Sequence, residues 1–313
     1  MSETLNDLKE VIRRKALGLG FCTAGFADAK PLSEALEEYR AMIDEGRHGE
    51  MGYLETGLEA RANPELLLPG VKSVLSVALP WPAPAKPGAI SGYAVIPDYH
   101  RVVGELLAEL LDFIRSICDQ PVNGRVCVDS LPVLETGWAE AAGIGRSGKN
   151  SLLIVPGHGS RVFLGELLLD LELEPDTPLD WAPCEGCTAC LDACPTGALS
   201  VPGKLDATRC ISYLTIELKR DFTNEEAAMA DSWLYGCDHC LDACPHNANI
   251  EATGYPGFEQ KKELVNLTPA KALELTNSQF RKLFAGTPAL RLGLRRLKRN
   301  ARAAVANKSQ SKS

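Results

Sequence analysis

The chain has 313 residues, of which 45% are apolar and 24% are charged, and its formal net charge is −8. This composition excludes wholesale disorder, and the length favours about two domains. No apolar run approaches the roughly 18 uncharged residues of a membrane span. The polar start, MSETLNDLKEVIRRK, lacks the apolar stretch of a secretory signal, so we expect a cytoplasmic protein. Eleven cysteines, an odd count, argue against a disulfide framework and indicate metal or redox chemistry.

The charge is unevenly distributed along the chain. Residues 281–313 contain ten Lys and Arg and no acidic residue, whereas residues 1–280 contain 23 basic and 41 acidic residues, a net charge of −18. An acidic body with a basic tail is typical of proteins that contact polyanions, but a solvated terminal helix gives the same pattern. Charge alone leaves both interpretations open.

The first 180 residues alternate helical and extended patterns. Three apolar stripes with helical spacing predict helices, over residues 5–19, 32–43 and 103–117. Four runs have extended character, at 73–79, 125–128, 152–155 and 161–164. A helix-permissive stretch, LETGWAEAAGI, precedes the third of these runs. Together these patterns predict an N-terminal domain of α/β or α+β class.

The cysteines divide the chain into three parts. Cys22, Cys118 and Cys127 are scattered and sit in apolar company, so we expect them to be small buried hydrophobes, and the other eight fall between 184 and 244. We therefore predict an N-terminal domain over 1–180, a cysteine-rich domain over 181–255 and a basic helical C-terminal segment over 256–313.

The cysteine-rich part contains the bacterial ferredoxin run C-x2-C-x2-C-x3-C-P, at Cys184, Cys187, Cys190 and Cys194. In such runs three cysteines ligate one cubane and the fourth ligates a second cubane. The second run, at Cys237, Cys240 and Cys244, has one cysteine too few, and the isolated Cys210 can complete it. We therefore predict a bacterial ferredoxin-like domain that holds two [4Fe–4S] clusters with interleaved ligands. The first takes Cys184, Cys187, Cys190 and Cys244, and the second takes Cys194, Cys210, Cys237 and Cys240.

Zinc is the alternative for paired C-x2-C motifs, but three thiolates within seven residues crowd a mononuclear tetrahedral site. A glycine-rich stretch, Gly143 to Gly148, matches a dinucleotide-binding fingerprint, yet it follows a helical pattern and precedes a strand, the reverse of what that motif needs. We expect this stretch to be either a helix C-cap or a loop that approaches a flat cofactor.

Further stretches carry a family resemblance. They are VDSLPVLE (128–135), AGIGRSGKN (142–150), RCISYLTIE (209–217) and RRLKRNARAAVAN (295–307), together with DYH at 98–100 and both cysteine runs. On these motifs the chain resembles the epoxyqueuosine reductases, cobalamin-dependent iron–sulfur enzymes of queuosine synthesis in tRNA. The resemblance covers about residues 5 to 307, without the C-terminal helical repeats of longer members.

The resemblance implies a cobalamin-binding N-terminal domain related to B12-processing and nitroreductase-like proteins. The two clusters would pass electrons that reduce cob(II)alamin to cob(I)alamin, which removes the epoxide oxygen of epoxyqueuosine and leaves queuosine. The partners it implies are tRNA and an external low-potential electron donor, and we expect a monomer without membrane contact.

The resemblance also implies roles for individual residues. Asp129 matches the family's proton donor, which needs a pKa raised by burial. The corresponding cobalamin contacts are Arg61, Ser91, Asp129, Leu153, Leu164, Ser212 and Asp238. The tRNA contacts it implies are Lys219, Arg295, Arg296, Lys298 and Arg299. Outside the resemblance, Asp129 could simply end a strand, and the two leucines could belong to the core.

The sequence departs from the family pattern at four points. Ser91 stands where some members carry a cysteine, residues 92 and 96–97 differ, Arg146-Ser147 replaces a commoner pair, and the helical repeats are missing. These departures keep two alternatives open. One is a soluble corrinoid enzyme resembling reductive dehalogenases, and the other is an iron–sulfur electron-transfer subunit without a corrin.

Overall fold

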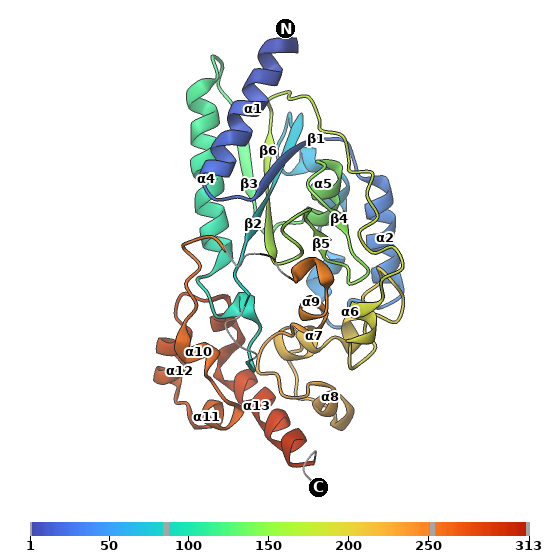
Figure 1. Ribbon diagram of the computed structural model, residues 1–313, viewed down its shortest axis with the longest axis vertical. Helices are drawn as coiled ribbons and strands as arrows, with labels where there is room; N and C mark the ends of the chain where they lie inside the picture. The colour runs from blue at the N-terminus through green and yellow to red at the C-terminus, as the bar shows by residue number, and fades with distance from the viewer. Residues whose placement is uncertain (1, 84–87, 249, 251–253, 311–313) are drawn as a thin grey trace.

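The computed structural model describes residues 2–83, 88–248, 250 and 254–310. Figure 1 shows a sheet flanked by helices in the N-terminal part, with the short helices of the cysteine-rich part and the C-terminal helices at the opposite end. No helix in the described part of the chain is long and apolar enough to cross a membrane.

The sheet has four strands in the order β1-β2-β6-β3. They are β1 (Thr23–Asp28), β2 (Ser73–Pro80), β3 (Gly124–Cys127) and β6 (Val162–Leu169). The central pair, β2 and β6, runs from Ser73 opposite Leu169 to Pro80 opposite Val162. All three strand pairs are antiparallel, so the domain is of the α+β kind rather than one built around a parallel sheet.

Helices cover both faces of the sheet. Helices α1 (Ser2–Gly18) and α4 (Tyr99–Ile117) lie on one face, and α5 (Glu135–Ala141) lies on the other. Alternate side chains of β2 serve the two faces: Leu75 and Val77 join the core under α1 and α4, whereas Val74 and Ala78 pack with Trp138 of α5. Helices α2 (Ser33–Asp44) and α3 (Leu58–Ala62) complete this part.

The helices and strands predicted from periodicity are confirmed, except that β6 extends five residues past the predicted run. Strand β1, TAGFAD, is not predicted, because its small residues lack the β-branched signature. Its Gly25 explains this composition. A Cβ at that position would lie 2.0 Å from the carbonyl oxygen of Ala142, which follows α5, so the close approach requires glycine.

The glycine-rich stretch is a helix C-cap. Gly143 has a φ of 69° directly after α5, and its N–H and that of Ile144 donate to the carbonyls of Glu140 and Ala139. A two-stranded hairpin of β4 (Arg146–Ser147) and β5 (Leu153–Ile154) follows. The helix-before, strand-after order confirms that this is not a nucleotide-binding loop.

The rest of the chain is built from short helices and one long one. They are α6 (Ala189–Asp192), α7 (Ile211–Ile216), α8 (Asn224–Met229), α9 (His239–Asp242), α10 (Lys262–Val265), α11 (Pro269–Glu274), α12 (Asn277–Phe284) and α13 (Gly293–Gln310). The C-terminal helices share an apolar core with Ile90, Val95 and Tyr235. The predicted helical C-terminus is therefore confirmed, and the exact domain boundaries stay a prediction.

Candidate active site

The eight clustered cysteines line two separate cavities. Cys184, Cys187, Cys190 and Cys244 line the first cavity, and Cys194, Cys210, Cys237 and Cys240 line the second. These are the two ligand sets that the spacing predicts, including the crossing of Cys194 and Cys244 between the two runs. Four thiols around each cavity fit the ligand requirement of a cubane.

A single zinc ion fits these cysteines less well. Among the described residues, no three His, Cys, Asp or Glu side chains lie close enough together to hold one metal ion. A cubane keeps its four thiolates farther apart than one ion does. The three remaining cysteines pack against the apolar cores, Cys127 completely and Cys22 and Cys118 partly. Burial raises the pKa of both Cys22 and Cys127 to about 12, which keeps them as unreactive thiols.

The second cavity, of about 300 Å³, extends beyond its cysteines into a space between the sheet and α7. Three of the predicted corrin contacts meet here: Ser91 and Ser212 line the cavity, and the buried Asp238 lies behind Ser91. The Ser91 hydroxyl donates to one Asp238 carboxylate oxygen, and the N–H of Gly92 donates to the other at 2.8 Å. The aromatic faces of Trp81 and Phe163 complete the lining, and such a mixed surface suits a large flat cofactor.

The other predicted corrin contacts lie away from this lining. Leu153 is buried in the core beside α5 and Leu164 packs against that core, whereas the leucines that line the cavity are Leu152, Leu199, Leu205 and Leu241. The Arg61 guanidinium lies over the Tyr39 ring at 4.7 Å. Its Nε is buried without a hydrogen-bond partner among the described residues, so it is available to a bound group.

Asp129 belongs to a chain of three titratable side chains. The ring of His100 lies between two carboxylates, with Nε2 2.7 Å from Asp129 Oδ2 and Nδ1 2.7 Å from Asp98 Oδ1. Asp98 is also the N-cap of α4, accepting from the His100 N–H, and this fixes its position. Tyr99 stacks on both His100 and Phe163, with centroids 4.1 Å apart in each case.

The expectation that Asp129 has a raised pKa is wrong. Burial does raise it, but the hydrogen bond from His100 and the positive charge of that ring outweigh burial, and the pKa of Asp129 falls below its ordinary value. The Asp129 side chain is also half exposed. Conversely, the hydrogen bonds to Asp129 and Asp98 raise the pKa of His100 to about 9. At neutral pH the proton therefore resides on His100.

The backbone also fixes the position of Asp129. Its φ of 54° is left-handed, which is strained for aspartate, and its N–H donates to Oε1 of Glu135 at 2.5 Å. Burial raises the pKa of Glu135. Glu135 thus fixes Asp129, which begins the turn before α5. Asp129 therefore has a defined position beside His100 and does not merely end the strand.

The predicted tRNA contacts lie where α13 meets α7. Lys219 and Arg295 are exposed, and Arg295 Nη2 donates to the carbonyl of Lys219 at 2.6 Å. Arg296 and Lys298 are half-buried, and Arg296 Nη1 donates to the carbonyl of Ile216. The structure therefore brings Lys219, Arg295 and Arg296 to one edge, but the two arginines also bind the backbone at and after the end of α7.

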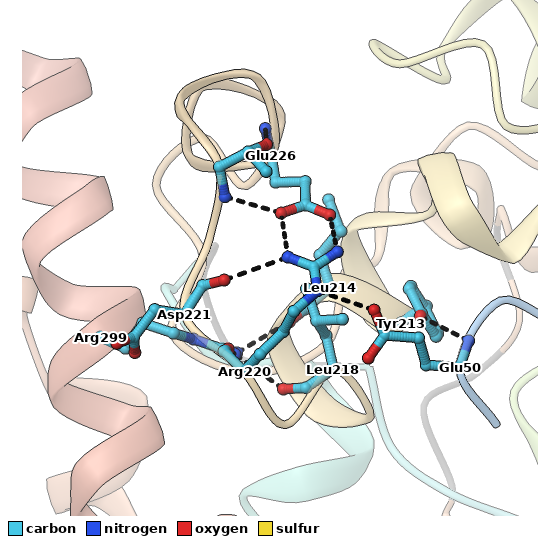
Figure 2. Close-up of polar contacts among 9 residues, drawn as sticks. Glu50, Tyr213, Leu214, Leu218, Arg220, Asp221, Glu226 and Arg299 are labelled. Atoms are coloured by element: carbon cyan, nitrogen blue, oxygen red, sulfur yellow. Dashed lines mark hydrogen bonds and ion pairs between the residues drawn. The ribbon is translucent and has the colours of Figure 1, made fainter. Parts of the chain in front are cut away.

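Arg299 requires a correction, because it is buried (5% exposed) and cannot face tRNA in this structure. Its guanidinium donates to the carbonyls of Leu214, Leu218 and Arg220 and lies 4.0 Å from the Phe222 ring. Figure 2 shows it reaching from α13 toward the loop that also carries Arg220, whose guanidinium pairs with Glu50 and Glu226. Arg299 is a structural residue that holds this loop.

Sequence reasoning assigned no role to His100, Glu135 or Asp98. A signal was available for two of them, since an Asp directly before the clearest amphipathic helix predicts an N-cap, and a His two residues later lies beside it. The ion pair with Asp129, 29 residues away, depends on tertiary packing and has no local signal.

Comparison with known proteins decides the family. A model described as the 4Fe-4S double cluster binding domain matches residues 183–247, and one described as epoxyqueuosine reductase QueG, DUF1730, matches residues 61–130. The chain is 38% identical to the epoxyqueuosine reductase of Cellulophaga algicola over 93% of its length and 96% of the relative. The corresponding enzyme of Escherichia coli is 38% identical over 98% of this chain and 83% of its own. The chain belongs to the epoxyqueuosine reductase family.

Solved epoxyqueuosine reductase structures share the fold. One, in complex with an epoxyqueuosine-modified stem loop of tRNA-Tyr, matches 97% of this chain and 82% of its own at a TM-score of 0.90 and 33% identity. Another, from Bacillus subtilis, has its catalytic aspartate loop swung out of the active site, and it matches 98% of this chain and 83% of its own at a TM-score of 0.89 and 32% identity. The predicted fold is thereby confirmed.

Proposed function

We propose that this protein reduces epoxyqueuosine to queuosine in tRNA. The observation that carries the proposal is the juxtaposition of two four-cysteine cavities with a mixed aromatic and hydroxyl-lined space, in a chain of this family. An electron-transfer subunit needs the two cysteine-lined cavities but not the additional space beside them. The 38% identity to enzymes named epoxyqueuosine reductase also favours this substrate over that of a dehalogenase-like enzyme.

The residues of the site fit the cofactors of this reaction. The two cysteine sets would hold two [4Fe–4S] clusters, and Ser91, Ser212 and Asp238 would hold cobalamin. Arg61, whose Nε has no hydrogen-bond partner among the described residues, would be a further contact outside this lining. When bound, the clusters and cobalamin supply the electrons that remove the epoxide oxygen. Leu153 and Leu164 support the site from the core, and the leucines of the cavity lining offer the apolar contact to the corrin.

The chain itself supplies the proton for the departing oxygen. Conversion of an epoxide to an alkene and water consumes two electrons and two protons. His100 holds one proton at Nε2, 2.7 Å from Asp129 Oδ2, and Asp129 faces solvent on its other side. We assign Asp129 as the group that delivers this proton to the epoxide oxygen and His100 as the group that reloads it. The second proton comes from solvent, which reaches the exposed side of Asp129.

Substrate tRNA would lie along the basic edge formed by the exposed Lys219 and Arg295 and the half-buried Arg296 and Lys298. Arg291 is a further exposed basic residue, and it pairs with Glu217 directly after α7. We further propose that an external low-potential donor reduces the protein, that it acts as a monomer and that it works in the cytoplasm, where tRNA is modified.

Cobalamin retention tests the cofactor part of this proposal. Protein purified anaerobically, loaded with clusters and cobalamin and desalted should retain corrin, seen as a cob(II)alamin electron paramagnetic resonance (EPR) signal. Ser212→Trp should fill the part of the second cavity that extends beyond the four cysteines and abolish corrin retention while the iron content stays unchanged. Ser309→Trp, on the exposed face of α13, should retain corrin. Loss of corrin from the unsubstituted protein would support the electron-transfer alternative instead.

A further inference from the structure

The side-chain amide of Asn150 is buried, and one of its two polar atoms makes no hydrogen bond. It is 5% exposed, and its Nδ2 has no hydrogen-bond partner among the described residues. Its Oδ1 accepts from the N–H of Leu152 at 3.2 Å, so the amide cannot be turned around without losing that bond. A buried N–H donor without a partner is destabilising, so this orientation of the amide indicates an acceptor that is bound in the loaded protein.

The unused amide nitrogen belongs to a side chain that lines both cysteine cavities. The backbone is shaped to place it there. A Cβ on Gly148 would lie 2.8 Å from Asn150 Oδ1, so glycine makes room for the amide, and Ser151 next to it has a left-handed φ of 64°. Lys149 anchors the same turn, since its Nζ donates to the carbonyl of Cys187 at 2.8 Å.

The two cavities differ in their other donors. In the second cavity the Thr196 hydroxyl already lies 3.6 Å from Cys194 Sγ. Among the described residues that line the first cavity, Asn150 and His246 are the polar side chains other than cysteine, and His246 Nε2 is engaged with the carbonyl of Pro183 at 2.8 Å. The first cavity therefore depends on Asn150 for a side-chain N–H.

We propose that Asn150 Nδ2 donates a hydrogen bond to a sulfur of the cluster held by Cys184, Cys187, Cys190 and Cys244, and that this bond sets its reduction potential. One-electron reduction adds a negative charge to the cluster, and an N–H donor stabilises that charge, so the bond raises the potential. Asn150 is thus a positioning and tuning residue of the electron path. The inference rests on the cluster-binding part of the proposed function and not on the substrate.

A redox titration without tRNA tests this inference. The holoprotein is reduced stepwise with dithionite and mediators, and the EPR signals of the two clusters are followed. Asn150→Leu should move one midpoint potential to a lower value and leave the other unchanged. Thr196→Val is the matched control, because it removes the hydroxyl beside Cys194 and should lower the other midpoint only.

Asn150→Asp guards against a folding defect, because it keeps the acceptor for the Leu152 N–H and replaces only the amide nitrogen. It should lower the same midpoint as Asn150→Leu at full iron content. Unchanged midpoints, a shift of the midpoint that Thr196→Val moves, or loss of iron from both Asn150 variants would overturn the inference. Absence of two clusters in the unsubstituted protein would instead contradict the proposed function.

Discussion

At the scale of single residues, the site separates the group that touches the substrate from the group that stores the proton. Asp129 is half exposed and has a lowered pKa, whereas His100, held between Asp129 and Asp98, has a pKa raised to about 9. Stacking of Tyr99 on the His100 ring keeps the imidazole in the plane of both hydrogen bonds. A carboxyl group paired in this way receives its proton from the neighbouring His100. It does not need burial to raise its own pKa and keep it protonated.

This arrangement predicts a pH-dependent contribution of His100 to stability. Because the folded-state pKa of about 9 exceeds the ordinary 6.5, the contribution is fully present below pH 6.5 and is lost as the pH rises through about 9. The melting temperature of the unsubstituted protein should exceed that of His100→Asn by the largest margin at about pH 6 to 6.5, which is at or just below the ordinary pKa of histidine. Thermal unfolding followed by circular dichroism measures the difference. A difference that stays constant up to pH 10, roughly one unit past the folded pKa, would contradict the assigned ion pairs.

At the scale of elements, the arginines of the basic helix α13 bind the protein's own backbone, whatever partner the helix also contacts. Arg295, Arg296 and Arg299 donate to the carbonyls of residues 214–220, which follow or end α7. Helix α7 begins beside Cys210 and carries Ser212, both of which line the second cavity. The C-terminal helix is therefore connected to the cluster and corrin site through one short helix.

Two substitutions separate the structural arginine from the exposed lysine. Arg299→Ala leaves the carbonyls of Leu214, Leu218 and Arg220 without this donor and should cost about 3 kcal/mol or more in urea unfolding. Lys219→Ala should leave stability unchanged and weaken tRNA binding. It should also reduce the slope of the logarithm of the tRNA binding constant against the logarithm of salt concentration by about 1. If Arg299→Ala kept its stability and weakened tRNA binding as Lys219→Ala does, Arg299 would be a direct contact after all.

How far the sequence predicts these elements depends on where their signals lie. The apolar stripe of α4 and the short apolar run of β2, which ends at Pro80, are local signals, so both elements were predictable, whereas β1 is a strand only because β2 and α5 pack against it. The direction of the Arg299 side chain depends on the backbone after α7, far away in the sequence. A count of basic residues cannot separate a buried arginine from an exposed one.

At the scale of the whole molecule, the number of cysteine ligands that each [4Fe–4S] cluster needs made the cysteine assignment predictable. Two cubanes need eight thiolate ligands, and the two runs supply seven, so the isolated Cys210 is the source of the eighth. The two cavities separate the cysteines as that arithmetic requires, with Cys194 and Cys244 crossing between the runs. The cofactor space beside Ser91 and Ser212 had no such constraint, and its prediction depended on family resemblance.

The central claim is that this molecule removes the epoxide oxygen of epoxyqueuosine in tRNA. The most direct measurement loads the protein with clusters and cobalamin anaerobically and adds dithionite and tRNA from cells that accumulate epoxyqueuosine. The nucleosides are then analysed by mass spectrometry. We predict a product lighter by one oxygen atom, formed at least about 100-fold more slowly by Asp129→Asn at equal cluster and corrin content. Unchanged epoxyqueuosine after incubation with the fully loaded, reduced protein would contradict the claim.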